Sequence, residues 1–511
     1  MPIAEQTDPE RTSANAFGKI ESRGIDRIPD DERHGHPREL VRIWAFASVN
    51  YLYIILGGLL IVFGLTVWQG LAVVVVGNLF WAAIGLLATS GPVSGTPSGV
   101  ITRAMFGTLG NRVIVGFFSW PSFIAYGAIN LSVGGLAAFA FTEQVGMSAQ
   151  RPVQIVIVLL IAALTLTISV YGYGTILRVS GAITTALALC MAVLGGFVLT
   201  KADWNYAPAA ESALSGGALW AVITAGIALT ASSPLSWAIS PDYARYLPAD
   251  TSRKAVATWT ALGGFIPAVL LGSVGVLAGS VVDMADAQKS LATILPGWFY
   301  PVFLLVIVIG SITNNVITLY SSGLCLQSVG LRLPRMATVL LCGLLGTAIA
   351  CYALFISDFT DALSNILELS VAFAGPWIAI IASDLLMRHN RYDGVELHDE
   401  SPQGPYWFSG GTNWAGCTAL VAGTTVGALC MNTTLFTGPI ASALGGADLT
   451  FVFGPTVAAC LYLVLVRTLY PAQYAVARNR TAPLDHAVTT SATTTTTTST
   501  STSTSTTSKE N

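Results

Sequence analysis

Amides, hydroxyls and aromatic rings interrupt several long apolar segments of this sequence, and these are the side chains best suited to bind a solute. Tyr126 and Asn130 are spaced i, i+4, so both lie on one face of a predicted helix. Asn314 and Asn315 form a pair in another segment, where each amide must find partners away from lipid. An amide offers one acceptor and two donors, while an aromatic ring offers a flat face for stacking. Since no lysine or arginine accompanies them, these residues favour a neutral, planar, hydrogen-bonding ligand.

Three charged residues within or next to the apolar segments are candidates for a gate or a proton site. Glu368 is the one carboxylate that we expect well inside a span. Such a residue is a functional hypothesis, here a proton site, and a neutral, hydrogen-bonded glutamate between packed helices is the alternative. Asp242 and Arg245 come at the end of another span and could form a gate. The alternative for them is an ordinary interfacial ion pair worth about 0–1 kcal/mol.

The sequence shows no pattern of an enzyme or a metal site. None of the seven cysteines forms a CxxC pair, and the five histidines fall in polar segments. A metal site would need His, Cys or acidic clusters at helical spacing, and the common nucleophile, zinc-protease and phosphate-loop motifs are missing as well. With a net charge of −3, the chain also lacks the basic surface that binds nucleic acid. We therefore expect no enzyme, no metal, no cofactor and no nucleic-acid partner.

The elements that must position these residues are membrane-spanning helices. Of the 511 residues, 53% are hydrophobic and 10% are charged, against about 25% charged in an average soluble domain. Because about 20 apolar residues span a bilayer as a helix, the composition predicts an all-α polytopic membrane protein. We expect twelve transmembrane helices within residues 41–470, at 41–64, 70–90, 112–139, 152–171, 178–199, 217–239, 256–280, 299–326, 336–356, 361–387, 413–431 and 448–470. Residues 1–40 form a polar N-terminal arm, and residues 471–511 a Thr/Ser-rich tail that we expect to be disordered.

Basic residues set the expected orientation. If the N-terminus is cytoplasmic, only Arg151, Lys201 and Lys289 of the 24 lysines and arginines fall in outside loops. A miscounted span would mix the two sides, so this asymmetry predicts an even number of spans with both termini in the cytoplasm. We expect a multi-pass protein of the plasma membrane, in contact with the lipid bilayer.

Helix-breaking clusters recur at equivalent positions in two halves of the chain. Residues 41–199 and 217–387 each hold five spans, and the first span of each half is interrupted, at residues 48–50 and 230–234. Paired interruptions of this kind point to a midplane solute site in inverted-repeat transporters. The sequence thus predicts a five-plus-five inverted repeat with broken helices 1 and 6, followed by two C-terminal helices at 413–470. For single small residues, close helix packing is the alternative role: Gly57, Gly58 and Ser132.

Five stretches, taken in order, resemble signatures of the purine–cytosine permease branch of the nucleobase–cation symporter family. They are GTPSGVITRAMFGTLG (95–110), YGAINLSVGG (126–135), PDYARYLP (241–248), TNNVITLYSSGLCLQ (313–327) and GPWIAIIASDLLMRHNRYD (375–393). One such motif is weak, but five in the same order are specific, and the resemblance covers nearly all of residues 38–395. It implies the fold described above, and the uptake of a purine or pyrimidine base, such as cytosine, with Na+ or H+.

The resemblance also implies roles for the polar residues of spans 3 and 8. Tyr126 stands where tryptophan is usual in the family and would stack on the base, while Asn130 would contact its edge. Asn314 and Asn315 straddle the family's base-binding amide, and we favour Asn315.

The second stacking face and the cation site follow from the same resemblance. Trp237 is the candidate for the second face, although in bacterial relatives that aromatic ring can lie at the position of Ser233. The cation site would combine the broken part of span 1 with span 8: Ala47, Ser48, Asn50, Ser311 and Thr313. Because carbonyl and hydroxyl oxygens bind Na+ without a carboxylate, we favour Na+ as the coupling ion, and a proton would use Glu368. The alternative solute is another neutral ring compound, such as a hydantoin, allantoin or a vitamin pyrimidine.

Overall fold

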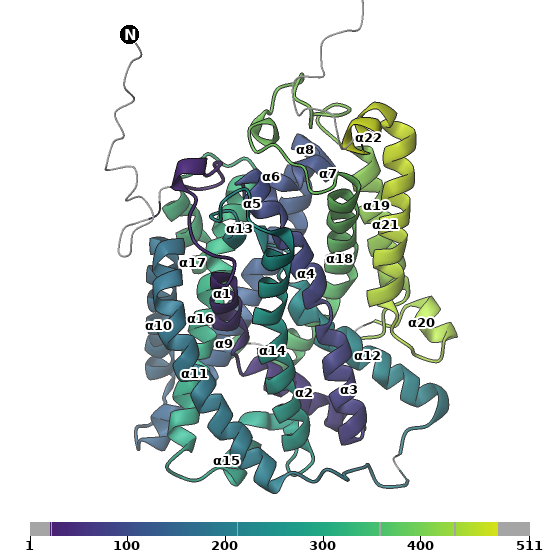
Figure 1. The fold of residues 1–511 in the computed structure, drawn as a ribbon. Coiled ribbons are helices and arrows are strands. Elements are labelled where there is room, and N and C mark those ends of the chain that lie inside the picture. The colour runs from purple at the N-terminus through teal and green to yellow at the C-terminus, as the bar shows by residue number, and fades with distance from the viewer. Residues whose placement is uncertain (1–20, 22, 212, 357–358, 434–435, 479–511) are drawn as a thin grey trace, which may run out of the picture.

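The described part of the chain is almost entirely helical. The computed structural model describes residue 21 and residues 23–211, 213–356, 359–433 and 436–478, with side chains described outside 359–369 and 478. Within these ranges the only extended pairings are two isolated bridges, Ser409 with Thr412 and Asn432 with Thr437. Figure 1 shows the long helices side by side, as the sequence predicts for a polytopic membrane protein.

Helices stand at every position where the sequence predicts a span. The first span is a bent pair, α1 (Glu39–Ser48) and α2 (Leu52–Val62), with a bend of 53° between them. The sixth is α12 (Gly216–Leu235), which ends in a turn at residues 236–240 before the short helix α13 (Pro241–Ala244). The prediction that helices 1 and 6 are broken is therefore confirmed. The predicted place of the second break is wrong, because residues 230–234 are still helical and the turn begins at residue 236. The other spans are α3 to α5 (Val67–Asn78, Trp81–Ala88, Ser90–Ser94), α8 and α9 (Thr108–Ile114, Trp120–Gln144), α10 (Arg151–Tyr171), α11 (Tyr173–Lys201), α14 (Arg253–Gly279), α16 (Tyr300–Ser328), α17 (Arg335–Phe355), α18 (Phe359–Met387), α19 (Trp414–Leu429) and α21 (Thr450–Leu469).

The exact number of spans stays a prediction. Among the described residues, ten helices are long and apolar enough to cross a membrane, or eleven when the bent pair α1–α2 counts as one span. The twelfth candidate is α19, whose 16 residues fall short of the roughly 20 that a bilayer core requires.

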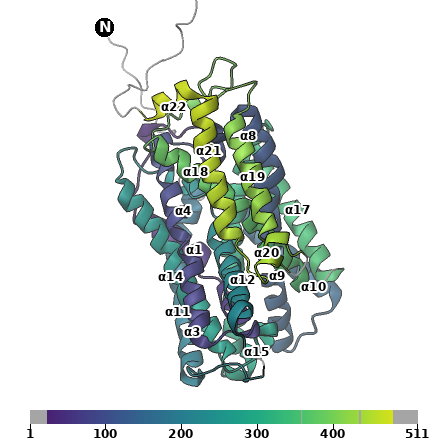
Figure 2. The ribbon, with the colours of Figure 1, turned by 90° about the vertical axis from the view of Figure 1, so that its right-hand side faces the viewer.

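The spanning helices pack as two sets. Helices α1 to α4 and α12 to α14 contact mainly one another, and we call them the bundle set. Helices α9, α10, α16 and α17 also contact mainly one another, and we call them the scaffold set. α19 and α21 pack against each other and against α18 at one side of the molecule, which Figure 2 shows face on. The two broken helices thus belong to one set, and helices α9 and α16, which carry Asn130, Asn314 and Asn315, belong to the other.

Glycines let backbones of the bundle set approach closely. A Cβ atom on Gly57 of α2 would lie 2.0 Å from the carbonyl oxygen of Gly272 on α14. A Cβ atom on Gly275 would lie 2.0 Å from the carbonyl oxygen of Ile54. Because no side-chain carbon fits at that distance, these positions require glycine, and close packing is the role of Gly57.

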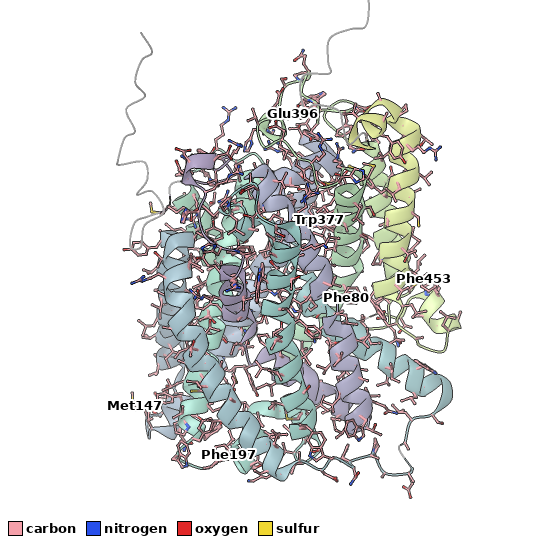
Figure 3. The ribbon with its side chains drawn as sticks, in the orientation of Figure 1. Phe80, Met147, Phe197, Trp377, Glu396 and Phe453 are labelled. Atoms are coloured by element: carbon pink, nitrogen blue, oxygen red, sulfur yellow. The ribbon has the colours of Figure 1, made fainter. Side chains whose placement is uncertain are left out.

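Arginines gather at one end of the molecule, which we call the arginine-rich end. In Figure 3 this end is marked by Glu396, while Met147 and Phe197 lie near the opposite end. The arginines that make contacts there are Arg33, Arg103, Arg112, Arg245, Arg253, Arg335 and Arg388. The sequence predicts most basic residues on one side of the membrane, and in the fold these arginines do gather at one end.

Both ends of the described chain lie at the arginine-rich end (Figure 1). Residues 21 and 23–33 pack against it as an N-terminal strap, in which Glu21 is 2% exposed and Ile28 0%. Part of the predicted polar arm is thus built into the fold. At the other terminus, α22 (Pro471–Arg478) follows α21, and the Thr/Ser tract lies outside the described residues.

The loop before α21 is held by one buried carboxylate. Asp448 is 4% exposed, and its oxygens accept hydrogen bonds from the backbone N–H groups of Asn432 and Thr450, at 3.0 and 2.9 Å. Burial raises the pKa of Asp448 above its ordinary value, against these hydrogen bonds, which lower it. The carboxylate therefore orders the start of α21 at an electrostatic cost.

Candidate functional site

A small cavity lies between the two broken helices and the asparagine-bearing helices α9 and α16. It is lined by Leu52, Phe123, Tyr126, Asn130, Ser233, Ser236, Trp237, Asn314 and Thr318. Five of the six residues that the sequence predicts to bind a solute meet in this lining. The cavity also lies where the bundle set meets the scaffold set, which is the place expected for a solute in an inverted-repeat transporter.

Two asparagine side chains form the polar centre of the cavity. Nδ2 of Asn130 donates to Oδ1 of Asn314 at 2.7 Å, and Nδ2 of Asn314 donates to the carbonyl oxygen of Ala47 at 2.8 Å. The hydroxyl of Thr318 donates to the backbone carbonyl of Asn314 at 3.0 Å. The chain of hydrogen bonds thus links α9, α16 and broken helix 1. A solute that displaces the bond between the amides finds a donor and an acceptor side by side.

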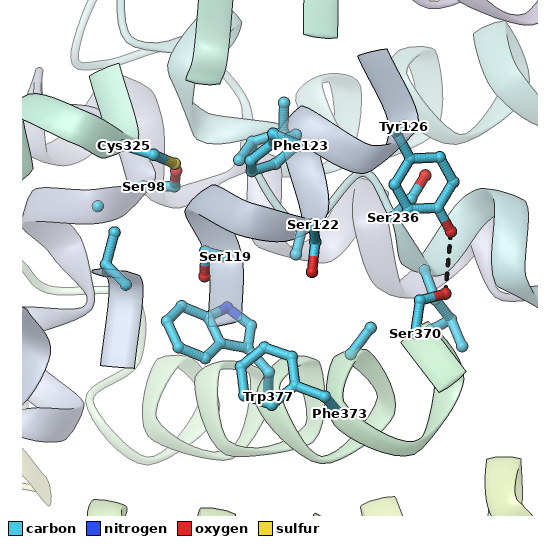
Figure 4. Close-up of a pocket in the computed structure, with 16 residues that line it drawn as sticks. Ser98, Ser119, Ser122, Phe123, Tyr126, Ser236, Cys325, Ser370, Phe373 and Trp377 are labelled. Atoms are coloured by element: carbon cyan, nitrogen blue, oxygen red, sulfur yellow. Dashed lines mark hydrogen bonds between the residues drawn. The ribbon is translucent and has the colours of Figure 1, made fainter. Parts of the chain in front are cut away.

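Aromatic side chains accompany the amide pair. The hydroxyl of Tyr126 lies 2.9 Å from Oγ of Ser370 on α18, as Figure 4 shows. Trp237 lies in the turn after α12 and packs edge-on against Trp44, with ring centroids 5.6 Å apart and an interplanar angle of 73°. This contact fixes the orientation of the indole. The lining therefore offers aromatic surface and neutral hydrogen-bonding groups, with no charged side chain.

Serines hold the turn of helix 6 in place. The hydroxyl of Ser233 donates to the hydroxyl of Tyr53 on α2 at 2.8 Å, which joins the two broken helices. The hydroxyl of Ser236 donates to the carbonyl oxygen of Ser233 at 2.7 Å. Ser233 and Trp237 both line the cavity, and of the two only Trp237 presents a ring for stacking.

Asn315 faces away from the solute cavity. It lines a separate cavity between α9, α10, α16 and α17, together with Gly127, Thr165 and Thr347. Its amide oxygen is buried there without a hydrogen-bond partner. Successive residues of a helix point about 100° apart, so one member of an adjacent pair must turn away. The structure thus places Asn314 at the solute cavity, in place of the Asn315 that the resemblance favoured.

The cation candidates of span 8 point in different directions. The hydroxyl of Thr313 donates to the carbonyl oxygen of Gly310 at 2.8 Å. Ser311 lies against α9, where a Cβ atom on Gly134 would be 3.0 Å from its own Cβ. Gly310 approaches the break of helix 1, since a Cβ atom on it would be 3.3 Å from the carbonyl oxygen of Val49. Of the two predicted hydroxyls, that of Thr313 is therefore the one that lies beside a backbone carbonyl oxygen near the break of helix 1.

The cation candidates of span 1 lie at the break itself. The carbonyl oxygen of Ala47 already accepts a hydrogen bond from Asn314. The side-chain oxygen of Asn50 accepts from the backbone N–H of Leu52 at 2.9 Å. The hydroxyl of Ser48 is buried with no hydrogen-bond partner. Ser48 and Ala47 therefore bring oxygen atoms to the break, whereas the oxygen of Asn50 stabilises the start of α2.

The predicted gate residues do not pair with each other. Oδ1 of Asp242 accepts hydrogen bonds from the backbone N–H and the hydroxyl of Ser98, at 2.8 and 2.7 Å. Arg245 instead lies with its Nη2 atom 3.5 Å from Oε1 of Glu21 in the N-terminal strap. Arg245 thus forms its ion pair with Glu21, which is far away in the sequence, and not with Asp242, which lies three positions before it. Glu368 falls on α18 among the residues whose side chains lie outside the described part.

A larger cavity leads from the solute cavity toward the arginine-rich end. It shares Phe123, Tyr126 and Ser236 with the solute cavity. Figure 4 shows this cavity, in which Phe373 and Trp377 of α18 lie beside serines of the segment before and within α9. The lining residues nearest the arginine-rich end include Ser98, Gly99 and Cys325. The two cavities together outline a path for a solute.

Sequence reasoning missed four lining residues of the solute cavity: Leu52, Phe123, Ser236 and Thr318. Helical spacing could have found two of them, since Phe123 comes three residues before Tyr126 and Thr318 comes four residues after Asn314. Leu52 directly follows the break of helix 1, and Ser236 begins the turn that breaks helix 6, so their positions depend on the geometry of those breaks.

Comparison with known proteins relates the whole transmembrane region to transporters. Residues 27–454 match the family described as permeases for cytosine/purines, uracil, thiamine and allantoin. YxlA of Bacillus subtilis, a provisionally named purine-cytosine permease, is 24% identical over 88% of this chain and 96% of its own length. The purine-cytosine permease fcyB of Emericella nidulans is 25% identical over 87% of this chain and 88% of its own.

Solved structures give the same fold. Mhp1, a nucleobase-cation-symport-1 family transporter, in a closed conformation with bromovinylhydantoin bound, aligns with a TM-score of 0.70 at 18% identity. The alignment covers 89% of this chain and 98% of that one. The alignment shows a shared fold, and the match to a permease family is what identifies a transporter rather than an enzyme. Because the family match spans most of the sequence, the chain belongs to the family of permeases for cytosine/purines, uracil, thiamine and allantoin.

Proposed function

We propose that this chain is a secondary active symporter that imports a nucleobase, cytosine or a purine, by alternating access. The observation that carries the proposal is the Asn130–Asn314 pair, which sets an amide donor and an amide acceptor in a cavity with Tyr126 and Trp237. The names of the relatives from Bacillus subtilis and Emericella nidulans support this solute class.

The cavity selects a solute by charge and by shape. Because its lining holds no charged side chain, an ionic solute would lose its hydration without gaining a partner, whereas a neutral base loses less. Stacking of a base on an aromatic side chain is worth about 1–3 kcal/mol. The edge of the base replaces the bond between Asn130 and Asn314. In the empty site the two amides satisfy each other, so neither is left buried and unpaired.

We propose Na+ as the coupling ion, bound by oxygens at the break of helix 1 and on α16. Ala47, Ser48 and Thr313 support this site, since their oxygens are neutral and lie at or near the break, and such ligands suit Na+ without a carboxylate. The carbonyl of Ala47 also accepts from Asn314 at 2.8 Å. A cation at that carbonyl therefore changes the hydrogen bonding of the amide that contacts the base, which couples the two sites. A proton carried by Glu368 is the competing mechanism.

We propose that the arginine-rich end faces the cytoplasm, with both termini on that side of the plasma membrane. The support is the excess of arginines there, since cytoplasmic segments carry most of the basic residues of membrane proteins. The larger cavity then leads from the solute site to the cytoplasm.

An uptake panel tests the proposal. Cells that express the protein are given labelled cytosine with and without Na+, and with a protonophore. We expect accumulation against the gradient that requires Na+ and that unlabelled purines or cytosine compete away. Stronger competition by hydantoin, allantoin or thiamine would shift the solute to another ring compound. Uptake that does not depend on Na+ but is abolished by the protonophore would identify the coupling ion as a proton. If no base accumulates, the nucleobase proposal is wrong.

A further inference from the structure

Several buried polar and charged side chains of the arginine-rich end meet around Glu21. Oε1 of Glu21 accepts hydrogen bonds from the hydroxyls of Tyr246 at 2.5 Å and Tyr320 at 3.1 Å. The same oxygen lies 3.5 Å from Nη2 of Arg245, and Oε2 lies 3.6 Å from Nη2 of Arg335. The side chains of both arginines and of Glu21 are at most 2% exposed. One buried carboxylate thus faces two buried guanidinium groups. Removing the carboxylate or a guanidinium group would leave an uncompensated buried charge, which costs stability.

The partners of Glu21 belong to both sets of helices. Arg245 and Tyr246 directly follow α13, so they belong to the bundle set. Tyr320 lies on α16 and Arg335 begins α17, so both belong to the scaffold set. Glu21 is therefore a point at which the two sets are joined at the arginine-rich end.

The rest of the N-terminal strap is anchored to α5 and to Arg245. The backbone N–H of Ile28 donates to the carbonyl oxygen of Gly95, after α5, at 2.8 Å. Nη1 of Arg33 donates to the carbonyl oxygen of Pro92 on α5 at 2.7 Å. Nη1 of Arg245 donates to the carbonyl oxygen of Gly24 at 2.8 Å. Because α5 packs against α4 and α13 of the bundle set, these contacts hold the strap on the side of that set, while the carboxylate of Glu21 reaches the scaffold set.

We propose that Glu21 is the latch of the cytoplasmic gate, whose bonds to Tyr320 and Arg335 hold the two sets of helices together and break when the gate opens. This role rests on the alternating access proposed above. When the latch opens, Arg335 keeps the backbone carbonyls of Ser169 and Val170, each at 3.0 Å. Because this guanidinium is then not left without partners, the latch can open without the full cost of a buried, unpaired charge.

The native Cys325 reports the state of this gate. It lines the cavity that leads from the solute site toward the arginine-rich end, and it is 3% exposed with the latch in place. A membrane-impermeant maleimide is applied to inside-out vesicles, and the labelled cysteines are identified by peptide mass spectrometry. We expect Glu21→Gln to raise the labelling rate of Cys325 about tenfold, which corresponds to about 1.4 kcal/mol of lost preference for the closed gate.

Asp31→Asn is the matched control variant. Asp31 lies in the same strap and is exposed, so the substitution removes the same charge without touching the latch. We expect its Cys325 labelling rate to equal that of the wild type. An equal rise in both variants would overturn the latch, because net charge of the strap would then explain the effect.

A second cysteine separates gating from loss of fold. Cys342 on α17 is 0% exposed and does not line the cavity, so gate opening should leave its labelling rate unchanged. A parallel rise at Cys325 and Cys342 would overturn the proposal. If Glu21→Gln does not fold, Tyr320→Phe decides. It removes the hydroxyl that donates to Glu21 and accepts from Nη2 of Arg245, and it should raise Cys325 labelling by about threefold.

The labelling test needs no solute, so it stays readable whatever the uptake panel shows. Cation-driven accumulation together with an unchanged Cys325 rate in both latch variants would refute the latch alone. A failed uptake panel with the expected labelling pattern would refute the solute assignment and leave the latch standing.

Discussion

Replacing Asn314 by alanine probes the solute site at its centre. The substitution removes the donor of the 2.8 Å bond to the Ala47 carbonyl and the acceptor of the 2.7 Å bond from Asn130. It also removes the amide that we expect to face the edge of a bound base. The side chain is 9% exposed, so water has little access to replace these contacts.

The expected effect follows from the cost of an unpaired polar group. Loss of a partner by a buried donor or acceptor costs about 1–3 kcal/mol. A base bound without this amide leaves at least one of its own polar atoms unpaired. We therefore expect the affinity for the base to fall by about 1–3 kcal/mol, or about five- to 150-fold. The empty protein should also be less stable, because Asn130 and Ala47 each lose a partner.

Binding to the purified protein and competition for uptake measure this change. Asn315→Ala is the matched control, because it removes the same side chain one position further along α16, where the amide lines the separate cavity between α9, α10, α16 and α17. We expect its affinity for the base to stay within about twofold of the wild type, since it makes no contact with the solute cavity. The reverse ranking, with Asn315→Ala losing affinity and Asn314→Ala keeping it, would refute the assignment of the site.

Three further tests address the stacking residue, the helix packing and the buried carboxylate. Tyr126→Phe keeps the ring, so it should lower base affinity less than Tyr126→Ala, which forfeits stacking worth about 1–3 kcal/mol; competition binding ranks the two, and equal losses would argue against stacking. Gly57→Ala places a methyl group 2.0 Å from the Gly272 carbonyl and should lower the Tm through about 1–3 kcal/mol of overpacking, whereas Gly181→Ala, with nothing within 4 Å, should not. Because the pKa of Asp448 is raised in the fold, its contribution to stability is complete below the unfolded value of about 3.9 and is lost as the pH rises through the folded value. Asp448→Asn should remove that part of the pH dependence of the Tm, and an identical pH profile in both proteins would contradict this account.

The spans and their breaks could be predicted because they are local properties of the sequence. Apolar length marks each helix, and the clusters at residues 48–50 and 230–234 precede the bend of helix 1 and the turn after α12. Residues 413–431 show what a local sequence pattern cannot predict. The apolar stretch is present, but α19 begins at Trp414 and ends at Leu429, so hydrophobicity alone does not give the length of the helix.

The site could be predicted by residue type but not by direction. Asn314 and Asn315 are identical in type, and which of them faces the solute depends on how α16 is rotated against α9 and α10. The partner of Arg245 is another example. Spacing pointed to Asp242, whereas the structure brings Glu21 from the N-terminal strap, and pairing over such a sequence distance has no local signal.

The contact between Trp44 and Trp237 gives the protein an optical signal of its own. The ring centroid of Trp44 lies 5.6 Å from that of Trp237 and 5.5 Å from that of Trp81. Indoles at this separation share their excited states, so their near-ultraviolet circular dichroism depends on the angles between the rings. Trp237 borders the solute cavity, whereas Trp81 begins α4. We therefore expect a solute that binds beside Trp237 to change the near-ultraviolet circular dichroism of these three native tryptophans, which a spectrometer measures without a label.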